Sequence, residues 1–211
     1  GQRPRPEVGG QPVGGGQIDQ RDVRAGSGQR PGRGRTDAAP GTGDEGWLRA
    51  IHAVVPQVLR AFRPQIIVSQ QGCDAHFADP LSHLAVSVDA MHAAYQLLHE
   101  LTHELTGGRW VALGGGGYEL VEVVPRAWTH LVAIAAHHPL SLTLEIPESW
   151  REHVSRRYGQ VAPQRMGDLG GRPIRYGDWG SGYELANPVD AAVMATRRAT
   201  FPGWGLDPWF D

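Results

Sequence analysis

Apolar residues recur at helical spacing from Asp44 onward, and this pattern predicts the first helix of the chain. Asp44 is a suitable N-cap, because a short carboxylate can accept hydrogen bonds from the free N–H groups of a first helical turn. Pro64 ends the helix. The next apolar run, residues 65–69, predicts a short buried strand. The apolar positions of the helix are Trp47, Leu48, Ile51, Val55, Val58, Leu59 and Phe62.

The alternation of helix and strand continues along the chain. A second helix is predicted over residues 87–105, a second strand begins at Trp110, and a third helix follows over residues 121–136. This order predicts an α/β fold in which an open parallel sheet is flanked by helices. After Pro139 the chain is rich in turns, and only short helices are expected there, near residues 148–158 and 189–198.

Residues 1–43 have a different character. They are rich in Gly, Arg, Gln and Pro, contain no aromatic residue and show no helix or strand period. Such a segment cannot bury enough apolar area to offset its ordering entropy, so we predict that it is disordered. Two alternatives are an arginine-bearing arm for nucleic acid and a stretch translated out of frame that rejoins near residues 39–43. The folded domain is then predicted over residues 44–211.

Composition limits the function classes. The chain has 211 residues, 40% of them hydrophobic, and a formal net charge of −2, which favours one ordinary domain and no specific nucleic-acid partner. The single cysteine, Cys73, excludes an internal disulfide and suits a reducing compartment. No signal peptide is visible, and no apolar run approaches the roughly 18–20 residues that span a bilayer. We therefore expect a cytoplasmic protein without a membrane partner.

Two polar loops follow the two predicted strands. The first reads Gln-Gly-Cys-Asp-Ala-His-Phe-Ala-Asp-Pro over residues 71–80, and the second places four glycines, residues 114–117, before Tyr118. Loops at the carboxyl ends of strands are where open α/β sheets bind their ligands. Consecutive glycines let a ligand approach the backbone closely, and Tyr118 can present its hydroxyl there. The sequence therefore predicts a site built from both loops.

These two loops, together with the segment at residues 123–129, resemble the zinc-dependent histone deacetylase superfamily. The resemblance runs from about residue 40 to the C-terminus and implies the C-terminal half of an arginase/deacetylase-like open sheet. It implies hydrolysis of an acetylated lysine in protein, or of a small acetylated amide, with release of acetate.

The resemblance also implies residue roles. Asp79 matches a zinc ligand, and Tyr118 matches the tyrosine that stabilises the oxyanion formed at the acetyl carbonyl. Gly115, Gly116 and Gly117 would border the substrate channel, and His76 would lie at its rim. The family's other two Zn²⁺ ligands and its histidine pair have no match in this sequence and are expected upstream. The chain as given is therefore expected to be an incomplete, inactive fragment.

Several alternatives stay open at this point. Asp79 could be a turn residue before a proline, and the glycines could form a phosphate cradle. The segment His99-Glu100-Leu101-Thr102-His103 matches the His-Glu-x-x-His pattern of zinc metalloproteases, with a third ligand from His130 or Glu122. His137 and His138, at a predicted helix end, are assigned a structural role. A non-catalytic remnant or binding module is the remaining alternative.

Overall fold

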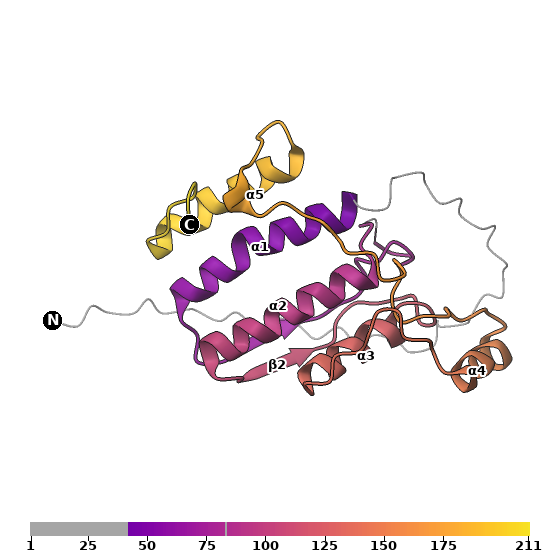
Figure 1. Ribbon diagram of the computed structural model, residues 1–211. Coiled ribbons are helices and arrows are strands. Elements are labelled where there is room, and N and C mark those ends of the chain that lie inside the picture. The colour runs from indigo at the N-terminus through magenta and orange to yellow at the C-terminus, as the bar shows by residue number, and fades with distance from the viewer. Residues whose placement is uncertain (1–41, 83) are drawn as a thin grey trace, which may run out of the picture. The chain divides into compact units, whose positions relative to one another are not determined.

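The computed structural model describes residues 42–82 and 84–211 (Figure 1). The predictions for the N-terminal segment therefore lie outside the described residues up to position 41. Helix α1 spans Thr42–Phe62 and begins before Asp44, so the predicted N-cap at Asp44 is wrong. Its carboxylate instead accepts hydrogen bonds from the Ser87 backbone N and from Ser87 Oγ, both at 2.6 Å. Asp44 thus fixes the start of the next helix.

A parallel β–α–β unit follows α1. Strand β1 (Ile67–Gln70) pairs with β2 (Trp110–Leu113) in a two-stranded parallel sheet, and α2 (Val88–Thr106) connects the two strands. Ser87 caps α2 through a bond from the Ala90 N–H to Ser87 Oγ, and Gly107 ends it in the left-handed conformation. The predicted α/β class and parallel pairing are confirmed; β1 starts two residues after the predicted range, and β2 begins at Trp110 as predicted.

The sheet is covered on one face only by the described residues. Ile67 is 6% exposed, whereas its neighbour Val68 is 61% exposed, and Val111 and Leu113 on β2 are 41% and 50% exposed. Successive strand side chains point to opposite faces, so these three apolar residues share the uncovered face. The strand that was predicted to be buried is therefore buried on one side, because the helices of this segment pack against the other.

The main core lies between the helices and the covered face of the sheet. Helix α3 (Val124–Ala135) packs against α2, and its start falls three residues after the predicted one, with Pro125 in its first turn. The buried residues of this core are Leu48, Cys73, Val86, Ala90, Met91, Ala94, Tyr95, Val123, Ala127, Leu131 and Ile134.

The C-terminal part adds short helices, as predicted. Helix α4 spans Glu148–Tyr158, the 3₁₀ helix η1 spans Trp179–Ser181, α5 spans Pro188–Thr200, and η2 spans Phe201–Trp204. Helix α5 lies along α1 (Figure 1) and shares a second small core with it. Among the described residues, no helix is both long and apolar enough to cross a membrane.

Candidate functional site

The two polar loops pack directly on each other at the carboxyl ends of β1 and β2. The Cys73 N–H donates to the Gly116 carbonyl at 2.6 Å. A Cβ atom placed on Gly117 would lie 2.5 Å from Cys73 Sγ, and one placed on Gly115 would lie 2.8 Å from the Gly72 Cα. The glycines are therefore required by the contact between the loops. The channel role of Gly115, Gly116 and Gly117 stays a prediction.

Asp79 joins the first loop to the second. It is 5% exposed, and its Oδ1 accepts bonds from the Leu81 N–H at 2.9 Å and the Ser82 N–H at 3.2 Å. Its Oδ2 accepts a bond from the Tyr118 N–H at 2.8 Å. The turn that the Asp-Pro sequence suggests is thus present. The same carboxylate also brings the predicted zinc ligand next to the predicted catalytic tyrosine.

The Asp79 carboxylate is held in its ionised form. Burial raises its pKa, but the backbone N–H donors of Leu81, Tyr118 and Ser82 lower it further, so the pKa lies below its ordinary value. Each carboxylate oxygen has two acceptor sites, and Oδ2 accepts a single bond among the described residues. An ionised carboxylate with a remaining acceptor site is a suitable ligand for a divalent cation.

Tyr118 is fixed through its backbone, and its side chain is 50% exposed. Because the bond to Asp79 holds only the backbone of Tyr118, its half-exposed phenol is free to contact a ligand. Its catalytic role stays a prediction.

His76 is placed differently from the rim position that the resemblance implies. The side chain is fully buried, its Nε2 lies 2.9 Å from Asp168 Oδ2, and its Nδ1 accepts a bond from the Ala78 N–H at 3.0 Å. A histidine with no exposed surface and both ring nitrogens engaged does not line a channel in the described part of the chain. It supports the loop, because the His76 carbonyl accepts the Asp79 N–H at 2.9 Å.

Asp168 connects this loop to α2 and α3. Its Oδ1 accepts from Arg126 Nη1 at 2.7 Å, and its Oδ2 accepts from the Val88 N–H at 2.8 Å as well as facing His76. Burial raises the pKa of Asp168, but His76, Arg126 and the Val88 N–H outweigh it and hold the pKa at about 2. A buried ionic network therefore supports the Asp79 loop from behind.

The sequence does not indicate a role for Asp168 or Arg126. Arg126 falls inside the segment at residues 123–129 that carries part of the resemblance, so a signal was available for it. Asp168 lies in the turn-rich stretch after Pro139, where no period or motif indicates its partners.

Cys73, next to the same loops, is not placed for chemistry. It is fully buried, and burial, together with the negative charges of Asp74 and Asp79, raises its pKa to about 11. A thiol that stays protonated at neutral pH is a poor nucleophile and a poor metal ligand.

A separate group of ligating side chains lies at the other end of α2. The ligand atoms of His99, His103 and His137 are all within 4.8 Å of one another, the one such group of three found in the described residues. The expected third ligands, His130 and Glu122, are not in this group. His130 is fully buried, and its Nε2 lies 3.3 Å from the Met166 carbonyl. His137 lies just after the end of α3, as a structural role would require, but it also has two histidine neighbours on α2 that the sequence did not indicate.

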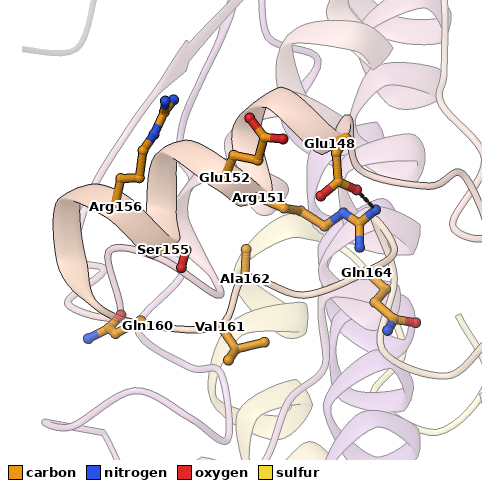
Figure 2. Close-up of a pocket in the computed structure, with 9 residues that line it drawn as sticks. All are labelled: Glu148, Arg151, Glu152, Ser155, Arg156, Gln160, Val161, Ala162 and Gln164. Atoms are coloured by element: carbon orange, nitrogen blue, oxygen red, sulfur yellow. Dashed lines mark hydrogen bonds and ion pairs between the residues drawn. The ribbon is translucent and has the colours of Figure 1, made fainter.

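A groove also lies beside α4. Its lining is rich in charged side chains, including an ion pair between Arg151 and Glu148, with Glu152 and Arg156 along the same helix (Figure 2). None of the predicted site residues lines it, so the groove gives no support to their roles.

Comparisons with known proteins agree with the resemblance. The histone deacetylase domain matches residues 12–135, so the match begins and ends earlier than the predicted range from about residue 40 to the C-terminus. The acetoin utilization protein AcuC of Bacillus subtilis is 42% identical over 90 residues, which cover 43% of this chain and 23% of that protein. AcuC of Staphylococcus xylosus is 35% identical over 112 residues, covering 53% and 29%, respectively.

Further comparisons extend the range of similarity. AcuC of Staphylococcus aureus strain Mu50 is 33% identical over 132 residues, covering 61% of this chain and 33% of that protein. The chain therefore matches between about a quarter and a third of the length of these relatives. A crystal structure of the HDA15 HD domain aligns with a TM-score of 0.36 and 26% identity over 44% of this chain and 26% of that chain.

Proposed function

Since the chain belongs to the histone deacetylase family, we propose that it forms part of a zinc-dependent amide hydrolase. The substrate is an acetylated lysine in protein or a small acetylated amide, and acetate is released. The AcuC relatives support a link to acetoin utilisation. One cysteine, with its thiol buried, suits a cytoplasmic location. Because α1 begins at Thr42, the folded domain is proposed to start at about residue 42 rather than at residue 44.

The hydrogen bond from the Tyr118 N–H to Asp79 Oδ2 carries the proposal. It fixes a metal-ligating carboxylate and a phenol-bearing residue relative to each other, although they come from loops that follow different strands. Catalysis needs both groups at one substrate carbonyl, and groups that are already fixed in place cost no reorganisation during the reaction.

The donor set of the described residues fits Zn²⁺ in part. Asp79 supplies an ionised carboxylate, and no group of three ligating side chains surrounds it within residues 42–82 and 84–211. Bound Zn²⁺ would supply Lewis-acid polarisation of the amide carbonyl and activation of water. Tyr118 would donate a hydrogen bond to the developing oxyanion, and its glycine neighbours would let the acetyl-lysine stem pass close to the backbone.

The uncovered face of the sheet supports an incomplete domain. Val68, Val111 and Leu113 form an exposed apolar surface on adjacent parallel strands, and parallel sheets are normally covered on both faces. In an arginase/deacetylase-like open sheet, further strands and helices would continue this layer and supply the remaining ligands. We therefore expect the 211-residue chain alone to be inactive.

The metalloprotease alternative has less support. Its two anticipated third ligands lie outside the histidine group, and His103 and His137 are exposed side chains at helix ends. A non-catalytic remnant or binding module is the other alternative, and the experiment below separates it from a hydrolase.

The test uses a chimaera in which residues 42–211 of this chain replace the corresponding part of Bacillus subtilis AcuC. We expect zinc-dependent release of acetate from an acetyl-lysine peptide. Tyr118→Phe should cost about 2.7–4 kcal/mol of transition-state stabilisation, a fall of roughly 100- to 1,000-fold in kcat, as for the loss of one oxyanion donor. Tyr158→Phe, at a similarly exposed tyrosine on α4, is the matched control. An unchanged rate for Tyr118→Phe, or a folded chimaera that is inactive with zinc, would contradict the proposal.

A further inference from the structure

The histidine group at the ends of α2 and α3 is built from two separate elements. His99 and His103 lie one turn apart on α2, so their rings share one face of that helix, and their Nε2 atoms are 3.1 Å apart. His137 comes from the turn after α3, and its ring centroid lies 4.8 Å from that of His99 and 5.1 Å from that of His103. Three imidazoles thus converge where α2 and α3 lie side by side (Figure 1).

The backbone at His137 is unusual in a way that favours this convergence. Its φ is +60°, in the left-handed region that non-glycine residues seldom adopt. Glycine and asparagine are the usual residues at such a helix end. A histidine that adopts this strained conformation places its ring beside the two histidines of α2, a placement that the role of ending α3 does not require.

The residues next to the His99 and His103 rings leave space for both imidazoles. The ring of His103 lies over Gly108, where a Cβ atom would come within 3.1 Å of the imidazole, and His99 lies beside Trp110 with ring centroids 5.9 Å apart. His103 belongs to the last turn of α2, where the helix dipole favours a cation. The rings are therefore positioned by packing and can reach the solvent side.

We propose that His99, His103 and His137 bind a first-row divalent transition-metal ion, with Zn²⁺ as the expected occupant, and thereby link the end of α2 to the end of α3. Tetrahedral Zn²⁺ with bonds of about 2.0–2.1 Å to imidazole nitrogens needs ligand atoms about 3.3 Å apart. The pair on α2 has this spacing, and a small change in the rotamer of the exposed His137 completes it. Three neutral nitrogen ligands exclude Mg²⁺ and Ca²⁺, which take oxygen ligands.

This site shares no residue with the Asp79 loop and does not depend on the proposed hydrolase function. Water would complete the coordination, since His103 and His137 are exposed. The site is a metal link between two helices, and its occupancy should raise the temperature of unfolding, because a ligand that binds only the folded state stabilises it.

The experiment measures Zn²⁺ binding by the tag-free 211-residue chain in competition with a chromophoric chelator. We expect one tight site per chain and a higher midpoint of thermal unfolding that a chelator reverses. His137→Asn keeps a residue that tolerates the left-handed conformation, so the fold should persist. Zinc affinity should fall by more than the roughly 100-fold that loss of an outer-sphere partner can cost, because a direct ligand is removed.

A matched variant makes the result specific. His138→Asn alters the adjacent exposed histidine outside the group and should leave zinc affinity unchanged. His103→Ala is a second loss variant, at an exposed position that should not affect folding. Absence of micromolar zinc binding by the unaltered chain would overturn the site. Wild-type affinity in His137→Asn and His103→Ala, or an equal loss in His138→Asn, would also overturn it.

Discussion

The two ends of helix α2 present opposite chemistry. At its amino end, the Ser87 N–H donates to the buried Asp44 and the Val88 N–H donates to the partly buried Asp168, so two carboxylates satisfy free donors at the start of the helix. At its carboxyl end, His99 and His103 meet His137 with more exposed rings and few bonds to other side chains. The helix dipole favours both arrangements, anions at the start and a cation at the end.

The difference lies in how each end is held. The amino end lies beside the carboxyl ends of β1 and β2, because the helix runs back across the sheet between two parallel strands. There, Asp168 joins α2, α3 and the Asp79 loop through buried charged bonds, so local geometry depends on distant partners. The carboxyl end depends on helical spacing and one turn. Its geometry can therefore be altered with little effect on folding.

The largest expected loss of stability comes from a substitution at the amino end of α2. Asp168→Ala removes the partner of Arg126, which is 4% exposed, and of His76. Because a buried cation is left without its anion, the free energy of unfolding should fall by about 3–5 kcal/mol. Urea unfolding monitored by circular dichroism measures it. His103→Ala without metal, at the exposed carboxyl end, should stay within about 0.5 kcal/mol of the unaltered chain. If both variants lost the same free energy of unfolding, the two ends of α2 would not differ in their contribution to stability.

A smaller effect comes from the middle of the helix pair, where buried His92 and His130 lie with ring centroids 4.7 Å apart. Burial, with the nearby His92, lowers the pKa of His130 to about 4, below the value near 6.5 expected in the unfolded chain. The unfolded state therefore binds the proton more readily between these values. Stability should be fully present above pH 6.5 and fall by roughly 2 kcal/mol as the pH drops to 5.

Urea unfolding at pH 7 and at pH 5 measures this dependence. His130→Gln removes the titrating group, so its stability should change less over the same interval. If the variant and the unaltered chain lose the same stability, His130 is not the group responsible.

The elements that sequence predicts well are those with a strong local period. Helix α4 has the predicted bounds, and α1, α2 and both strands lie within a few residues of them. Errors occur where a distant partner decides the outcome. Asp44 has the chemistry of an N-cap, but its carboxylate bonds Ser87, which lies far along the chain. The first strand was likewise predicted to be buried, but its burial depends on whether helices cover both faces of the sheet, which the sequence of the strand does not determine.

The candidate site divides in the same way. The loops that contain Asp79 and Tyr118 could be found from composition and position after strands, and their contact through a backbone N–H is consistent with one shared site. The burial of His76 could not be predicted, because Asp168 comes from a turn-rich stretch with no period. His137 was paired by sequence with His138, whereas its spatial neighbours come from α2.

Asp79→Asn in the AcuC chimaera tests the proposed zinc-ligand role of Asp79 most directly, with His137→Asn included so that zinc at the histidine group is not counted. Asn keeps the shape of the side chain but supplies a neutral ligand, and its amide nitrogen cannot accept the Tyr118 N–H. Asp74→Asn, in the same loop, is the matched control. We predict that Asp79→Asn loses bound zinc and acetyl-lysine hydrolysis, whereas Asp74→Asn retains both. Full zinc content and activity in a folded Asp79→Asn chimaera would contradict it.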